Sequence, residues 1–157
     1  MESKNLAHKI SELIFEKKGY DVKILDLSKV ASFADYFVLC TADSDTQVKA
    51  ISDEVERKLR EDGVNSWHRE GYESLSWVLL DYVDVVVHIF KKDARQYYNL
   101  EKLWGDAPIV DVQDPVAQKA QSPAKSEKRP VKKKSTNSAG KKKNTAGKSK
   151  PAKKSKK

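Results

Sequence analysis

Two pairs of carboxylates are the side chains of this sequence best placed to do chemistry. Asp43 and Asp45 flank Ser44, a spacing that could hold a metal ion. Asp81 and Asp84 lie inside the most apolar run of the chain and could serve as a general acid and a general base. We favour a simpler interpretation of each pair. The dipole of a helix stabilises acids at its first turn, and acids in a hairpin turn stay in solvent.

No other group of residues in the sequence completes an active site. His8, His68 and His88 are far apart, and none has a ligand partner at metal-binding spacing. A glycine-rich phosphate loop and a nucleophile elbow are both absent from the sequence. The single cysteine, Cys40, lies in an apolar run that is typical of a buried, inert thiol. The sequence therefore predicts a protein that is not an enzyme and that needs no metal or cofactor.

The run SWVLLDYVDVVVHIF, residues 76–90, is predicted to form a β-hairpin that turns at Tyr82 and Val83. Residues paired across a hairpin point to the same face of the sheet. One face would be aliphatic and belong to the core, with the pairs Leu80–Val85, Val78–Val87 and Ser76–Ile89. The other face would mix aromatic, aliphatic and ionisable groups, with the pairs Asp81–Asp84, Leu79–Val86 and Trp77–His88.

The mixed face has two possible roles. If two helices cover the aliphatic face, the mixed face is left partly open, and its composition is that of a protein interface. If a third helix covers it, Trp77 belongs to the core instead. The residues alone leave both possibilities open.

The periodic patterns around this run predict an α/β or α+β domain with a mixed sheet of five strands flanked by helices. A capping box of Ser44 and Gln47 begins the second helix, and Gly105 and Pro108 follow the last one. The helices have apolar stripes at Leu6, Ile10, Leu13 and Ile14, at Val48, Ile51, Val55 and Leu59, and at Tyr97, Leu100 and Trp104. Strands are expected at residues 21–27, 36–41 and 65–71 and in the two arms of the hairpin.

Charge divides the chain into a domain at residues 1–110 and a tail at residues 111–157. The first part has 15 Lys and Arg against 20 Asp and Glu, and the second has 16 against 3. The tail has too few apolar residues to offset its ordering entropy, so we expect it to be disordered. Its lysines would bind a polyanion such as RNA without base stacking. The residues concerned are Lys132, Lys133, Lys134, Lys141, Lys142 and Lys143.

The sequence also bears on location. The first residues have no continuous apolar segment, so they do not predict a secretory signal. The run at residues 76–90 is too short and too charged to span a membrane. With a single cysteine, these features lead us to expect a cytoplasmic protein.

Four segments, in this order, resemble the ribosomal silencing factor family, also called the Iojap family. They are ADYFVLCTADSDTQVKAISDEVE, REG, WVLLDYVDVVVHIF and ARQYYNLEKLWGDAP. The resemblance covers about residues 5 to 108 and leaves the lysine-rich tail outside it.

The resemblance implies a fold similar to nucleotidyltransferases without their catalytic residues, and a homodimer in the free protein. It implies binding to the large ribosomal subunit through the subunit's protein numbered fourteen. That contact would block joining of the small subunit and repress translation when nutrients are limiting. Carried over by motif, the partner surface comprises Trp77, Leu79, Asp81, Tyr82, Asp84, Val86 and His88.

This sequence departs from the family pattern at three positions. The family often has glycine where this chain has Val83, and a β-branched residue is not expected to adopt the positive φ of a tight turn. We therefore expect a wider hairpin loop. The family often has glycine and arginine where this chain has Ala42 and Thr46, so a partner contact through that arginine is missing.

Overall fold

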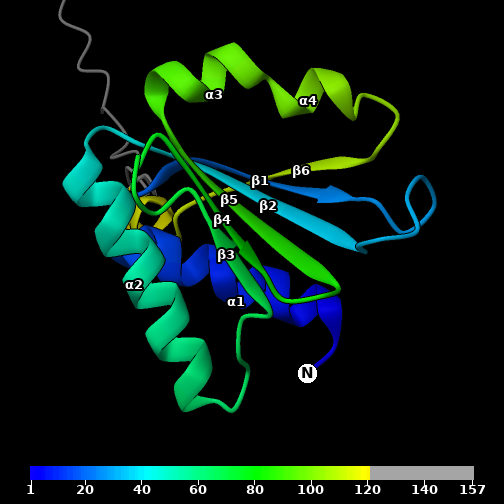
Figure 1. Cartoon of the computed structure of the whole chain (residues 1–157), viewed down its shortest axis with the longest axis horizontal. Helices are drawn as coiled ribbons and strands as arrows, with labels where there is room; N and C mark the ends of the chain where they lie inside the picture. Colours follow the sequence, from blue (N-terminus) through cyan, green and yellow to red (C-terminus); the bar gives the residue numbers. More distant parts are fainter. Residues whose placement is uncertain (121–157) are drawn as a thin grey trace, which may run out of the picture. The chain divides into compact units, whose positions relative to one another are not determined.

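Residues 1–120 are the part of the chain that this computed structural model describes, and in them six strands form one mixed sheet with helices on both faces (Figure 1). None of these helices is long and apolar enough to cross a membrane. The tail lysines named above lie outside the described residues. The elements in chain order are α1 (Ser3–Glu16), β1 (Tyr20–Asp26), β2 (Tyr36–Ala42), α2 (Asp45–Glu61), β3 (His68–Glu70), β4 (Trp77–Asp81), β5 (Val85–Lys91), α3 (Lys92–Tyr98), α4 (Leu100–Leu103), β6 (Ile109–Val112) and α5 (Pro115–Ala120).

The strands lie in the order β3-β4-β5-β2-β1-β6, and β2 and β5 form the parallel pair at the centre. The predicted α/β fold with a mixed sheet and flanking helices is confirmed. The predicted number of five strands is wrong, because β6 pairs antiparallel with β1 from Val22–Val112 to Leu25–Ile109. Asp111 and Val112, which we expected in the tail, are part of this edge strand. The strands were predicted from patterns of apolar and polar residues, and the exposed edge strand β6 lacks such a pattern.

Helices α1 and α2 cover one face of the sheet, on the lower side in Figure 1. Their predicted apolar stripes are buried in one core with the aliphatic face of β4 and β5. Cys40 is fully buried in the same core, and burial raises the pKa of its thiol to about 12. The core under these two helices includes Leu6, Ile10, Leu13, Ile14, Val48, Ile51, Val55, Leu59, Val78, Leu80, Val87 and Ile89.

Helices α3 and α4 lie over the opposite face, on the upper side in Figure 1. We predicted one helix through Trp104, but the chain breaks at Asn99, which has a φ of 41°. Asparagine tolerates this left-handed conformation, and its side chain accepts a hydrogen bond from the Lys102 amide. The break places Leu100 in the apolar core between these helices and the sheet, where it joins Phe37 and Phe90. It leaves Tyr97 82% exposed. The predicted common face of Tyr97, Leu100 and Trp104 is therefore wrong.

The β4–β5 hairpin pairs two residues away from the predicted register. Trp77 lies opposite Phe90, Leu79 opposite His88, and Asp81 opposite Val86. The assignment of residues to the two faces is nevertheless confirmed, because side chains alternate with a period of two and a shift of two keeps each on its face. The predicted pair Asp81–Asp84 does not form.

The turn is tight, contrary to the expected wider loop. Val83 adopts a φ of 71°, and the Asp84 amide donates to the carbonyl of Tyr82 at 2.9 Å, which closes a γ-turn. The Asp81 side chain accepts from the Val83 amide at 2.8 Å, and the Asp84 carbonyl accepts from the amides of Asp35 and Tyr36. These bonds hold a β-branched residue in a conformation that it rarely adopts.

The strained turn leads to a stability prediction. Val83→Gly should raise the free energy of unfolding by about 1 kcal/mol, because glycine adopts positive φ without a steric penalty and the exposed valine side chain loses little burial. Urea denaturation checks this value. The control Val83→Ala keeps a Cβ, so it should gain much less. Equal gains from both variants would contradict a backbone origin.

Candidate protein interface

The face of the sheet opposite α1 and α2 is covered unevenly. On β5, the side chains of Val86, His88 and Phe90 are buried. On the adjacent strand β4, Trp77, Leu79 and Asp81 are only partly buried. Helix α3 packs against β5 and β2, which explains the difference between the two strands. We call the surface of Trp77, Leu79 and Asp81 the open β4 face.

Trp77 is the largest side chain of the open β4 face, and its position is fixed by aromatic contacts. Its ring stacks on Phe90 at 5.1 Å between centroids and lies 4.6 Å from the ring of Tyr98 in α3. The indole Nε1–H donates to Nδ1 of His88 at 3.2 Å. The indole is therefore held in one orientation while part of it stays accessible.

His88 lies beneath Trp77 and is a buried support rather than a contact residue. It is 3% exposed and packs against Phe37, with ring centroids 4.5 Å apart. Burial, with a smaller effect from the charge of Arg95, lowers the pKa of His88 to about 3. The hydrogen bond from Trp77 requires a neutral His88 ring, because Nδ1 can accept the indole proton only when it carries no proton itself.

The seven residues proposed from the resemblance do not share one surface. Trp77, Leu79 and Asp81 form the open face, whereas Val86 and His88 lie buried behind it. Tyr82 is on the opposite face, where it is 6% exposed in the core under α1 and α2. Burial raises the pKa of its hydroxyl. Tyr82 is thus a core residue, and Asp84 is exposed in the turn.

Strand β3 adds charged groups along the border of the open β4 face. His68 lies opposite Asp81, and Glu70 lies opposite Leu79, so both share the face of their partners. The His68 ring is within 2.8 Å of the Glu70 carboxylate. The resulting surface has an aromatic and aliphatic centre and an acidic border.

Arg95, which was not among the predicted site residues, positions the helix that supports Trp77. Its guanidinium is buried and donates to Glu101 at 2.5 and 2.9 Å, to the Thr41 hydroxyl at 3.1 Å and to the Asp21 carbonyl at 3.1 Å. Burial would raise the pKa of Glu101, but the hydrogen bond from Arg95 lowers it below its usual range. This network ties α3 and α4 to β1 and β2. An arginine among the polar residues of a helix is expected to be exposed to solvent, so nothing in the sequence indicated that Arg95 is buried.

The predicted helix cap at Ser44 is confirmed, and Asp45 lies in the first turn of α2. Ser44 caps α2 and accepts from the Gln47 amide at 3.1 Å. The Gln47 side chain accepts from the Asp43 amide and donates to the carbonyls of Lys17 and Lys18. Within residues 1–120 no group of three or more His, Cys, Asp or Glu side chains could hold a metal ion.

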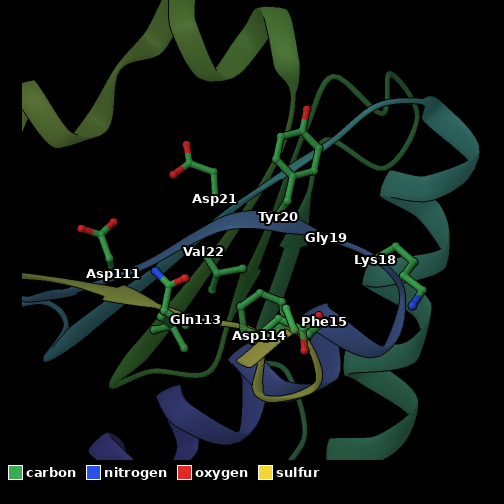
Figure 2. Close-up of a pocket in the computed structure, with 11 residues that line it drawn as sticks. Phe15, Lys18, Gly19, Tyr20, Asp21, Val22, Asp111, Gln113 and Asp114 are labelled. Carbon is green, nitrogen blue, oxygen red and sulfur yellow. The ribbon is translucent and has the colours of Figure 1, made fainter. Parts of the chain in front are cut away.

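Figure 2 shows a cavity of about 400 Å³ where β1, β6 and α5 meet the end of α1. Asp21, Asp111 and Asp114 are among its lining residues. The side chains of Tyr20 and Asp21 lie on one side of β1 in Figure 2, and Phe15 and Asp114 lie on the other. Asp21 and Asp111 both lie within ion-pair distance of the Lys23 ammonium, at 3.9 and 3.6 Å, so their charges are already partnered and the arrangement does not favour a cation-binding site.

Comparisons with known proteins agree on one family. The family model described as "Ribosomal silencing factor during starvation" matches residues 1–144. A ribosomal silencing factor of Bacillus subtilis (strain 168) is 47% identical over 97 residues, which are 62% of this chain and 82% of that protein. The chloroplastic protein Iojap of Zea mays is 32% identical over 71% of this chain, and the match spans 48% of that longer protein.

Solved structures show the same fold. A crystal structure of a protein from Chromobacterium violaceum is 42% identical in sequence, with a TM-score of 0.65. The match covers 67% of this chain and 88% of that one. A crystal structure from Bacillus halodurans is 39% identical, with a TM-score of 0.62 over 69% of this chain and 99% of that one.

The buried histidine makes stability depend on pH. In the unfolded chain His88 should titrate near pH 6.5, and in the folded protein its pKa is about 3, so the unfolded state binds more protons between these values. The stabilisation is complete above pH 6.5 and is lost as the pH falls toward 3. We expect a loss of about 2 kcal/mol from pH 7.5 to pH 5.

Urea denaturation at both pH values measures this loss, and His88→Phe serves as the control because its ring fills the site without titrating. The variant should lose about 2 kcal/mol less than the wild type over the same interval. Equal losses in the two proteins would exclude His88 as the cause.

Proposed function

Because this chain belongs to the ribosomal silencing factor family, we propose that it binds the large ribosomal subunit and sterically blocks joining of the small subunit. The proposed contact is the large-subunit protein numbered fourteen. Occupation of that surface represses translation when nutrients are limiting. The protein acts in the cytoplasm, and its free form is a homodimer.

The open β4 face is the observation that best supports this proposal. Trp77 and Leu79 present apolar area that the chain leaves accessible, and an aromatic anchor is a common hot spot in protein interfaces. The contacts of Trp77 with Phe90, Tyr98 and His88 hold the indole before a partner arrives. Little side-chain entropy is then lost on binding.

Charge favours a basic partner. Residues 1–120 have 16 Lys and Arg against 22 Asp and Glu, a net charge of −6. Three acids lie on or beside the open β4 face: Asp81, Glu70 and Asp84. Charges at the border of an interface steer the association of the two partners. A basic ribosomal protein complements this border.

The proposed mechanism needs no catalysis and no cofactor. It differs from that of an enzyme related to nucleotidyltransferases, which would need metal-binding carboxylates and a phosphate-binding turn. Calorimetric titration with Mg²⁺ and nucleotides separates the two functions. Measurable heat of nucleotide binding would support the enzyme.

The lysine-rich segment gives a second, weaker contact in this proposal. We propose that Lys132, Lys133, Lys134, Lys141, Lys142 and Lys143 contact ribosomal RNA through its phosphates. Such contacts add affinity that falls steeply with salt and carries no sequence preference.

Replacement of the anchor tests the docking surface. Trp77→Ala should weaken co-sedimentation with purified large subunits by at least about 30-fold, because truncation of a hot-spot tryptophan removes 2 kcal/mol or more. The same variant should permit subunit joining in a reconstituted assay. Circular dichroism verifies that the variant is folded.

Val116→Ala is a matched control, because Val116 is an exposed apolar residue in α5, away from the open β4 face. It should bind like the wild type. Wild-type binding by a folded Trp77→Ala variant would refute the site.

Removal of the basic segment tests its contribution. A chain that ends at Ser122 keeps the compact unit of residues 1–122 and should still bind large subunits. Its affinity should be lower at low salt and less dependent on salt, since each lost phosphate contact reduces the slope of log K against log salt by about 0.9. Complete loss of binding at all salt concentrations would instead favour a general RNA-binding protein that depends on its tail.

A further inference from the structure

Three exposed apolar side chains from separate parts of the chain meet at the turn end of the β4–β5 hairpin. Phe33 comes from the loop before β2, Trp67 precedes β3, and Val83 is in the turn; they are 59%, 80% and 59% exposed. Together with Asp81 they line a pocket of about 280 Å³. Exposed apolar side chains that converge in this way mark interaction sites.

The two aromatic residues are anchored at the sheet. The Phe33 ring packs edge-on against Trp104 at 5.8 Å and lies 6.0 Å from the ring of Phe37. The Trp67 amide donates to the Asp81 carbonyl at 2.7 Å, which extends the β3–β4 pairing by one residue. One wall of the pocket is therefore hydrogen-bonded to β4, the strand that carries the open β4 face, and the other packs against Phe37 of β2 and against Trp104.

Val83 completes the pocket in a strained conformation. Its positive φ is maintained by the Asp81 carboxylate and by the γ-turn. Strain in a β-branched residue persists only where the surroundings impose it, and such residues concentrate at functional sites. Here the strain holds an apolar side chain in solvent beside Trp67.

Asp81 gives the pocket its charge. One carboxylate oxygen accepts from the Val83 amide at 2.8 Å. Among residues 1–120, no Lys, Arg or His side chain lies within ion-pair distance of this carboxylate. His68, across the strand pair, is oriented to Glu70 instead. A carboxylate that lines a pocket together with two aromatic side chains suits a cationic group with an apolar stem.

We propose that this pocket binds an arginine side chain of the partner protein, with its stem on Val83 and Phe33 and its guanidinium between Trp67 and Asp81. The inference rests on the proposed function, since the partner would also cover the open β4 face. A planar guanidinium stacks on an indole and pairs with a carboxylate better than an ammonium group does. The chain's own basic segment at residues 121–157 has 14 lysines and one arginine, so an external partner fits the pocket better.

Nuclear magnetic resonance of the full chain labelled with ¹⁵N-tryptophan tests the pocket without a ribosome. A blocked Val-Arg-Val tripeptide should shift the Trp67 indole signal saturably, and the Trp104 signal serves as an internal reference. The uncharged citrulline peptide of the same size should bind at least about fivefold more weakly. Asp81→Asn keeps an acceptor for the Val83 amide and should weaken binding of the arginine peptide about tenfold.

Equal shifts with both peptides, or no shift with either, would overturn the proposal. So would a Trp67 signal that moves with added salt before any peptide is present and then ignores the peptide. That result would mean that the chain's own basic segment occupies the pocket.

Co-sedimentation with large subunits separates this inference from the proposed function. Trp67→Ala should bind about tenfold more weakly than the wild type. If Trp67→Ala binds normally while Trp77→Ala does not, the pocket inference fails and the proposed function stands. If the wild type does not bind large subunits although the arginine peptide saturates the Trp67 signal, the proposed function fails and the pocket remains a site for cationic side chains.

Discussion

Side-chain alternation along β4 and β5 is the constraint on which the rest of this structure depends. It sends Val78, Leu80, Val87 and Ile89 toward α1 and α2, and it sends Trp77 and its neighbours to the other face. Both faces of the hairpin are apolar enough to need a cover, but the second is covered over β5 and only in part over β4. Part of β4 thus stays accessible because α3 packs over β5 and β2 and no other helix covers β4 on this face within residues 1–120.

Helix α3, which covers β5, is held in place by the hydrogen bonds and the ion pair of Arg95. Arg95 bonds to Glu101, Thr41 and the Asp21 carbonyl, and α3 then brings Tyr98 against Trp77. A buried ion pair contributes little net stability, but loss of one partner leaves an uncompensated charge. The pair therefore acts mainly by fixing one position of α3, and through it one orientation of the indole.

Opposite charges on two parts of one chain agree with the partner of protein and RNA that we propose. The acidic border of the folded part complements a basic protein, and the lysine-rich segment complements phosphates. The pocket of Phe33, Trp67, Val83 and Asp81 would add a specific cation contact at the end of the apolar surface. The contributions of the acidic border and of the lysine-rich segment differ in salt dependence, so measurements of affinity at several salt concentrations can separate them.

The sequence by itself determined the fold class, the helix stripes, the cap at Ser44 and the two faces of the hairpin, because these follow from local periodicity and capping chemistry. Only the tertiary structure decided the register at Val83, the sixth strand and the break at Asn99. A tight γ-turn at a valine and an exposed edge strand depend on hydrogen bonds from distant residues such as Asp35 and Leu25. Tyr82, Arg95 and Trp67 show the same limit, since burial or exposure of an amphipathic side chain depends on which elements pack beside it.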